Sequence, residues 1–146
     1  MKLAFGGDPN ATELKMALIA KAQSLGHEAT DFGSEDPIYA NVAADVARAV
    51  VNGSYDRGVV VCGTGIGVSL AANKVKGAYC ALLADPYAAE RATVSNNANM
   101  IAMGARTTGI ESAKMLLEIY LSNTFDPDSP SGVKVARILE IEEEEL

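Results

Sequence analysis

Six consecutive residues, Cys62-Gly63-Thr64-Gly65-Ile66-Gly67, combine a potential base with a backbone that can hold an anion. The three alternate glycines allow a tight turn and a close approach of the backbone to a ligand. Their N–H groups, together with the N-terminus of a following helix, can bind a phosphate or a developing oxyanion. A cysteine beside a helix N-terminus can act as a base or as a nucleophile. The simpler alternative is a tight turn after a strand that ends in a buried cysteine.

Other polar residues stand next to neighbouring apolar runs. Asp8 comes directly after the first run, where a carboxylate can hydrogen-bond sugar hydroxyls or relay a proton, although it can equally cap the next helix. The polar cluster Ser95-Asn96-Asn97-Ala98-Asn99 precedes another run and is by itself typical of a loop. Arg106 and Arg137 are either surface charges or phosphate ligands, because arginine binds phosphate through two parallel hydrogen bonds.

The glycine spacing argues against two other phosphate-binding motifs. The dinucleotide fingerprint Gly-x-Gly-x-x-Gly needs a third glycine where Val68 stands, and the first turn, Gly7-Asp8-Pro9, lacks the fingerprint as well. A phosphate-binding P-loop would end in Gly-Lys-Ser or Gly-Lys-Thr, which is absent. A nicotinamide oxidoreductase is therefore a minor alternative, which cofactor binding by the purified protein would reveal.

Alternating strand and helix patterns position these residues. Strands are expected over 2–5, 27–32, 57–61, 78–83 and 100–103, and helices over 12–25, 41–51, 68–74, from 86 onward, over 111–121 and over 133–141. Asn10 is the expected N-cap of the first helix, and Asp85 with Pro86 suits the start of another. The alternation predicts a parallel sheet with helices on both faces, and ligands of such sheets bind beyond the carboxyl ends of the strands.

Length and composition exclude several classes of protein. The 146 residues predict one domain, residues 1–146. A net charge of −7 argues against a nucleic-acid partner. Cys62 and Cys80 make no disulfide framework, and neither a signal segment nor an apolar stretch of membrane-spanning length is found. We therefore expect a cytoplasmic protein without a membrane partner. The single histidine, His27, makes histidine base catalysis and multi-histidine metal sites unexpected.

Together these motifs resemble the type B ribose-5-phosphate isomerases and the related galactose-6-phosphate isomerase subunits. The resemblance covers nearly the whole chain and is most specific where the Cys62–Gly67 segment is followed by Ala71-Ala72-Asn73-Lys74-Val75. Further matching segments are Gly26-His27-Glu28, Asp31-Phe32-Gly33, Asp85-Pro86-Tyr87 and Met103-Gly104-Ala105-Arg106. The resemblance implies a Rossmann-like three-layer α/β/α sandwich with a five-stranded parallel sheet. It also implies an aldose–ketose isomerase of a sugar phosphate without cofactor or metal.

The resemblance further assigns a role to each matching residue. In that family, the cysteine that matches Cys62 takes a proton from the carbon next to the carbonyl and so creates a cis-enediolate. The resemblance implies that Thr64 moves a proton between the two oxygens and that Asp8 orients the sugar. The residues implied to contact the intermediate, the substrate or its phosphate are Gly63, Gly65, Gly67, Tyr39, Asn96, Arg106 and Arg137. It also implies a homodimer, or a tetramer made of two dimers, whose active sites are each shared between two subunits.

Three departures from the family pattern concern how the substrate is handled. Pro9 stands where the family usually has a histidine. Ser95 replaces a second histidine, which opens the furanose ring in the pentose-phosphate members. Near the C-terminus, two arginines four residues apart become Val133 and Arg137, and Lys134 partly replaces the lost charge. We interpret this pattern as retained proton-transfer machinery in a changed substrate-binding shell.

The missing histidine favours a substrate that needs no ring opening, because serine is a poor acid–base group at neutral pH. A four-carbon sugar such as erythrulose 4-phosphate cannot form the usual furanose, because its terminal oxygen carries the phosphate. Ribose 5-phosphate with ribulose 5-phosphate is the second candidate, and galactose 6-phosphate is less favoured. An alternative of another class is a non-catalytic sugar-phosphate-binding or regulatory protein. The lost histidines favour that alternative, whereas Cys62 and Thr64 oppose it.

Overall fold

A five-stranded parallel sheet forms the centre of the structure, a computed structural model that describes all 146 residues. Its strands are β1 (Lys2–Gly7), β2 (Glu28–Asp31), β3 (Arg57–Cys62), β4 (Cys80–Leu82) and β5 (Met100–Gly104). They lie in the order β2-β1-β3-β5-β4, and every neighbouring pair is parallel. From β1 the chain first moves outward to β2 and then returns to place β3 on the other side of β1. The direction of winding therefore changes between β1 and β3, where sheets of this kind bind ligands.

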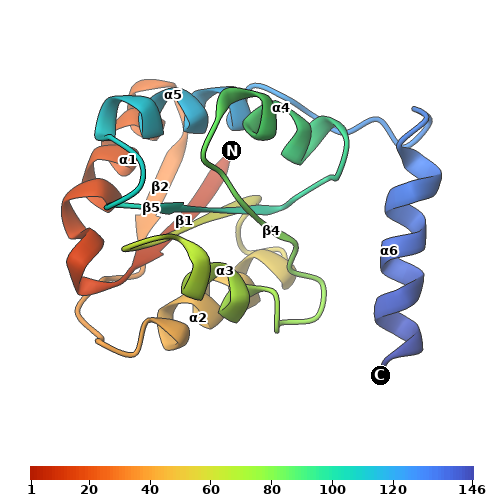
Figure 1. Cartoon of the computed structure of the whole chain (residues 1–146), viewed down its shortest axis with the longest axis horizontal. Coiled ribbons are helices and arrows are strands. Elements are labelled where there is room, and N and C mark those ends of the chain that lie inside the picture. Colours follow the sequence, from red (N-terminus) through yellow and green to blue (C-terminus); the bar gives the residue numbers. More distant parts are fainter.

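Helices cover both faces of the sheet (Figure 1). They are α1 (Thr12–Ser24), α2 (Tyr39–Val51), α3 (Ile66–Ala72), α4 (Pro86–Val94), α5 (Ile110–Leu121) and α6 (Gly132–Glu144), with a short 3₁₀ turn, η1 (Pro9–Ala11), before α1. In Figure 1, α4 and α5 lie above the sheet and α2 and α3 below it. Helix α1 runs along the left-hand side, and its buried residues belong to the same core as those of α4 and α5. The expected three-layer α/β/α sandwich is confirmed. None of the helices combines the length and apolarity that a membrane crossing would require.

Two hydrophobic cores follow from the two-residue period of the strands. Alternate strand residues such as Phe5 and Val61 pack with α1, α4 and α5. Their neighbours, such as Val60 and Cys62, pack with α2 and α3 instead. Strands that are buried on both faces read as continuous apolar runs. This is why the central strands could be located from the sequence, and why the side chain of Cys62 belongs to the α2 and α3 layer.

The start of the first helix differs from the sequence prediction. Asn10 is not the N-cap; its backbone N–H donates to Asp8 Oδ2 at 2.9 Å, and Ala11 precedes α1 without a capping side chain. The reason is Pro9, which begins a 3₁₀ turn and shifts the cap to the residue before the proline. The predicted cap at Asp85 is confirmed, because its Oδ1 accepts the Ala88 N–H at 2.8 Å.

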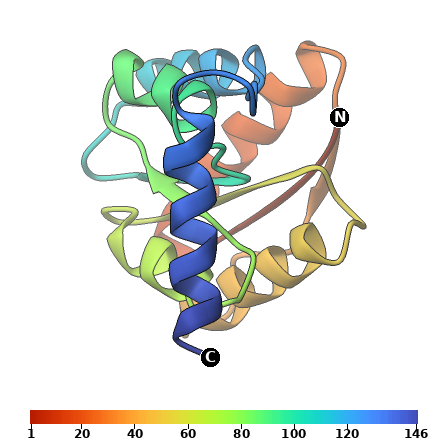
Figure 2. The same cartoon turned by 90° about the vertical axis from the view of Figure 1, so that its right-hand side faces the viewer.

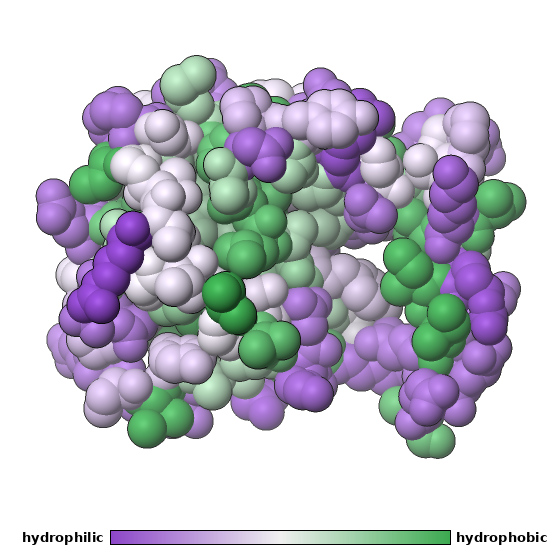
Figure 3. All heavy atoms as spheres, viewed as in Figure 1, coloured by the Kyte–Doolittle hydropathy of each residue, from purple (hydrophilic) through white to green (hydrophobic).

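Helix α6 stands apart from the sandwich, beside the β4 edge of the sheet (Figure 2). Val135 is its only buried residue, while Val133 and Ile138 are 77% and 47% exposed. Glu142 fastens its C-terminal half by accepting the Tyr79 hydroxyl at 2.6 Å and the Gly77 N–H at 3.2 Å. Apolar side chains of α6 border the hollow that separates the helix from the rest of the molecule (Figure 3). The chain therefore leaves much of this apolar surface uncovered.

Candidate active site

The glycine loop connects β3 to α3 and rests directly on the end of β5. Gly65 has a φ of +79°, a conformation that favours glycine, and a Cβ there would lie 2.9 Å from the backbone carbon of Met103. On the other side of the contact, a Cβ at Gly104 would lie 2.6 Å from Thr64 Cα. The close approach that the structure shows is between two segments of backbone, and the approach to a ligand stays a prediction. Gly104, which ends β5, was part of a segment that matched the family, but its sequence gave no sign that it would contact the Thr64 backbone.

Backbone hydrogen bonds fix the loop and the sulfur of Cys62. The Gly65 N–H donates to Cys62 Sγ at 3.1 Å, and the side chain of this cysteine lies at the floor of a pocket. The Ala105 N–H donates to the Cys62 carbonyl at 2.8 Å, and the Arg106 N–H donates to the Gly63 carbonyl at 2.9 Å. An N–H aimed at the sulfur stabilises negative charge on it. This arrangement suits a sulfur that acts as a base.

An open cavity of about 230 Å³ lies at the change of winding between β1 and β3. It is lined by Asp8, Tyr39, Cys62, Gly63, Thr64 and Gly67. These residues come from the turn after β1, the first residue of α2 and the loop after β3. All six are residues that the sequence singled out, although they lie up to 59 positions apart (from 8 to 67).

For Asp8, the cap that was considered is confirmed, and its contact with a substrate stays a prediction. Its carboxylate caps η1 through Oδ2 and also lines the cavity. Its own N–H donates to the Val61 carbonyl at 2.9 Å, which ties this turn to the neighbouring strand that carries Cys62. The cap leaves the second carboxylate oxygen available to a ligand, so one side chain can hold both the turn and a substrate hydroxyl.

Tyr39 gives Gly67 a role that the sequence did not reveal. A Cβ at Gly67 would overlap the hydroxyl and ring of Tyr39, which pack over the start of α3. Gly67 is therefore required for the tyrosine to lie against the loop, in addition to any contact of its N–H with an anion. This packing joins α2 to α3 on one side of the cavity.

Comparison with known proteins agrees with this architecture. The family described as Ribose/Galactose Isomerase matches residues 3–138. The chain belongs to this family. A ribose-5-P isomerase B from Listeria innocua is 42% identical over 146 residues, which cover 98% of each chain. A D-erythrulose-4-phosphate isomerase from Pectobacterium atrosepticum is 40% identical and covers 94% of this chain and 93% of its own.

The fold also matches a solved member of the family. The structure of ribose-5-phosphate isomerase B from Clostridium thermocellum superposes with a TM-score of 0.93 over 100% of both chains, at 34% identity. The resemblance stated from the motifs and the expected fold are therefore confirmed. The chain is an isomerase, since the relatives that it matches along nearly its full length carry that activity in their names.

The remaining predicted residues of this isomerase lie outside the cavity of the same chain. Arg106 borders the loop, because its Cδ lies 3.8 Å from where a Cβ of Gly63 would be. Ser95 and Asn96 follow α4, and Asn96 lines a different cavity, beneath α6. Lys134 and Arg137 lie on α6 itself. The structure thus divides the predicted site into a group around Cys62 and a group at the β4 edge.

Within the second group, two side chains have partners that the sequence did not indicate. The Arg91 guanidinium lies 3.4 Å from Ser95 Oγ, one helical turn away. Arg137 contacts Glu144 at 2.6 Å and Glu140 at 3.2 Å, and the hydrogen bonds that it donates to these carboxylates raise its pKa. The cation that was predicted to bind phosphate is therefore paired with acids of its own helix.

The two cysteines of the isomerase differ in their chemistry. Cys80 is buried beneath α6, and burial raises the pKa of its thiol to about 12. It therefore stays a neutral thiol at physiological pH. Cys62 alone combines a place in the cavity with a backbone N–H that donates to its sulfur.

Proposed function

We propose that this isomerase interconverts the aldose and ketose forms of a small sugar phosphate, with an open-chain tetrose phosphate such as erythrulose 4-phosphate as the favoured substrate. Ribose 5-phosphate with ribulose 5-phosphate is the second candidate. One observation carries the proposal: Cys62 Sγ receives the Gly65 N–H in a cavity that it shares with the Asp8 carboxylate. Proton transfer between two sugar carbons requires a base, here Cys62, and a group that orients the sugar hydroxyls, here Asp8.

The proposed reaction moves one proton between neighbouring carbons. The Cys62 thiolate takes the proton from the carbon next to the carbonyl, and the released electron pair moves onto the carbonyl oxygen to form a cis-enediolate. The Thr64 hydroxyl transfers a proton between the two oxygens. The thiol then returns its proton to the other carbon, which completes the isomerisation without a cofactor. The Gly65 N–H donates to the sulfur and is not free to bind the oxyanion. The other loop N–H groups, including those of Gly63 and Gly67, would stabilise the oxyanion instead.

The position of the single histidine supports an open-chain substrate. His27 precedes β2, at the amino ends of the strands, and its Nδ1 lies 2.9 Å from the Met1 nitrogen. The cavity lies at the carboxyl ends, where Asp8 is followed by Pro9. With no imidazole near the cavity to open a furanose, a four-carbon phosphate that lacks this ring is the better match.

We also propose that two copies complete each active site. Asn96, Lys134 and Arg137 would reach the cavity of a partner chain, together with Ser95. The uncovered apolar side of α6 supports this arrangement, because such a surface is typical of an interface. A homodimer, or a tetramer of two dimers, would therefore be the active form. Its expected location in the cytoplasm stays a prediction.

A substrate panel tests the function. The protein is incubated in D₂O with ribose 5-phosphate, both erythrulose 4-phosphates, allose 6-phosphate and galactose 6-phosphate, and each conversion is followed by NMR. We expect turnover of a tetrose phosphate, with deuterium at the carbon that receives the proton. Equal or better turnover of ribose 5-phosphate would retain the chemistry and overturn the assignment of the substrate.

The variant Cys62→Ser separates the enzyme from a non-catalytic binding protein on the same fold. We expect kcat to fall by roughly 10²–10⁴, the usual contribution of a positioned acid–base group, while calorimetry still detects ligand binding. Cys80→Ser is the matched control and should retain its activity. Binding without turnover in the wild-type protein would favour the regulatory alternative.

A further inference from the structure

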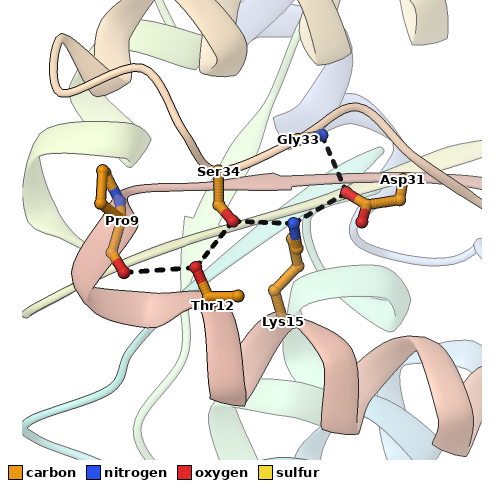
Figure 4. Close-up of polar contacts among 6 residues, drawn as sticks. All are labelled: Pro9, Thr12, Lys15, Asp31, Gly33 and Ser34. Atoms are coloured by element: carbon orange, nitrogen blue, oxygen red, sulfur yellow. Dashed lines mark hydrogen bonds and ion pairs between the residues drawn. The ribbon is translucent and has the colours of Figure 1, made fainter.

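A buried lysine of α1 forms a polar network that the proposed reaction does not use. Lys15 lies near the start of α1, and its side chain is only 4% exposed. Its ammonium lies 2.9 Å from Asp31 Oδ1 and donates to Ser34 Oγ at 2.8 Å (Figure 4). Asp31 Oδ1 also accepts the Gly33 N–H at 2.8 Å. A buried ammonium is costly without such partners, so its position is tightly defined.

Ser34 extends the network to the turn in front of α1. Its Oγ is 2.8 Å from Thr12 Oγ1, and the Thr12 hydroxyl in turn donates to the Pro9 carbonyl at 3.2 Å. The Gly7 N–H donates to the Gly33 carbonyl at 3.1 Å. The segment that follows β2 is therefore fastened to the segment that follows β1 at several points.

Both fastened segments lead to walls of the cavity. The first, residues 7–12, contains Asp8. The second, residues 31–38, ends immediately before Tyr39, which begins α2 and packs over Gly67. The network contacts neither the β3–α3 loop nor Cys62, which are held by their own bonds to the turn after β5. One half of the cavity thus has a side-chain network of its own, in addition to the bond from the Asp8 N–H to the Val61 carbonyl.

We propose that Lys15 is a positioning residue of the active site, which holds Asp8 and Tyr39 in register with each other through Asp31, Ser34 and Thr12. The inference deepens the proposed function, on which its kinetic part rests. An apolar residue at this place in α1 would bury as well as lysine does. A multivalent donor on α1 contacts both Asp31 and Ser34 and so reinforces the direct bonds between the two segments, which gives geometry rather than packing alone.

Hydrogen exchange followed by mass spectrometry tests the proposal without a substrate. In Lys15→Met, amide exchange should become faster in both segments, 7–12 and 31–39, and stay unchanged in the loop 62–67. Lys21→Met is the matched control, because Lys21 lies on the same helix but pairs with Glu118 of α5. Unchanged exchange in the two segments, or faster exchange spread evenly over the whole chain, would overturn the proposal.

Ser34→Ala keeps the test valid if Lys15→Met does not fold. This variant removes the link to Thr12 but leaves the ion pair between Lys15 and Asp31 in place. It should also speed exchange in the two segments, to a smaller extent than Lys15→Met.

Kinetics and labelling provide the second readout. For the sugar phosphate that the wild-type protein converts, Lys15→Met should raise KM and lower kcat/KM roughly 10- to 100-fold, the scale expected for misplaced groups. The rate of Cys62 alkylation by iodoacetamide should stay the same. Unchanged kinetic constants in a variant with looser segments would overturn the positioning role. If the wild-type protein converts no sugar phosphate, the proposed function fails, and the exchange experiment still decides the inference.

Discussion

At the scale of single residues, Cys62 and Cys80 show how strongly surroundings control one functional group. Both are buried free cysteines in the same core. The sulfur of Cys62 receives a backbone N–H in the cavity that it shares with Asp8, whereas Cys80 lies beneath α6, where burial raises the pKa of its thiol. The sequence could identify Cys62 only because glycines follow it. It carried no sign of the chemical state of Cys80.

Cys80 should reduce the stability of the fold in alkali. Burial raises the pKa of its thiol from 9.0 to about 12, so the folded state keeps a proton that the unfolded state loses. Below about pH 9 the group has no effect. As the pH rises toward 12, the free energy of unfolding should fall by up to about 1.4 kcal/mol per pH unit. Urea unfolding of the wild-type protein and Cys80→Ala measures the difference. Identical pH dependence of the two proteins would contradict the buried-thiol explanation.

At the scale of elements, the contact between α2 and α3 depends on the absence of a side chain at Gly67. Gly67→Ala should displace Tyr39 and lower kcat/KM by about tenfold, in keeping with the sensitivity of catalysis to small displacements. Tyr39→Ala should remove the conflict, so the double variant should be no worse than Tyr39→Ala alone. Steady-state kinetics of the four proteins measure this non-additivity.

Gly109→Ala is the control for a glycine replacement. Gly109 has a φ of −63°, and no atom lies within 4 Å of the place that a Cβ would take, so alanine fits there. This variant should keep wild-type activity. Independent, additive effects of Gly67→Ala and Tyr39→Ala would show that the tyrosine does not depend on the glycine.

Helix α6 provides a second prediction at this scale. The carboxylates of Glu144 and Glu140 accept hydrogen bonds from the Arg137 guanidinium, which is proposed to bind phosphate. Glu144→Gln should therefore lower KM for the sugar phosphate by a few-fold, the modest effect expected of an exposed ion pair. Glu145→Gln removes the same charge from the same tail without a contact to Arg137 and serves as the control. An equal fall of KM in both variants would indicate that the negative charge of the C-terminal tail repels the substrate, and that Glu144 does not compete with phosphate for Arg137.

The elements differ in how well the sequence could predict them. The strands were predictable because continuous apolar runs are typical of buried strands. The β3–α3 loop was predictable because its three alternate glycines indicate a tight turn. The N-cap at Asn10 was wrong, because Pro9 starts a 3₁₀ turn of its own. Lys15 could not be identified, since a lysine in a helical pattern reads as surface charge until its distant partners, Asp31 and Ser34, are known.

At the scale of the whole molecule, a shared active site predicts complementation between two defective variants. Cys62→Ser removes the proposed base from its own cavity, and Arg137→Ala removes the cation that is proposed to serve the partner's cavity. A dimer of one copy of each would contain one intact site and one doubly defective site. Random mixing should therefore restore about a quarter of wild-type activity.

The measurement is activity after the two variants are unfolded together and refolded, with each variant refolded alone as the control. No recovery in the mixture would contradict a site built from two chains. The sequence alone could not place this second group of residues. The position of α6 depends on contacts with residues more than 60 positions earlier in the chain, such as Tyr79 with Glu142, which no local pattern indicates.

The close backbone contact between the glycine loop and β5 also bears on how such an enzyme can change during evolution. At Gly65 and Gly104 there is no space for a side chain, so the loop that carries the proposed base cannot accept a larger residue at either position. Residues 133–138 on the outlying helix are largely exposed and can vary without disturbing the sheet. Selection for a new sugar phosphate would therefore accumulate substitutions on α6 and after α4, while the loop stays fixed. The β3–α3 loop is thus constrained by its packing, whereas helix α6 can diverge between related enzymes.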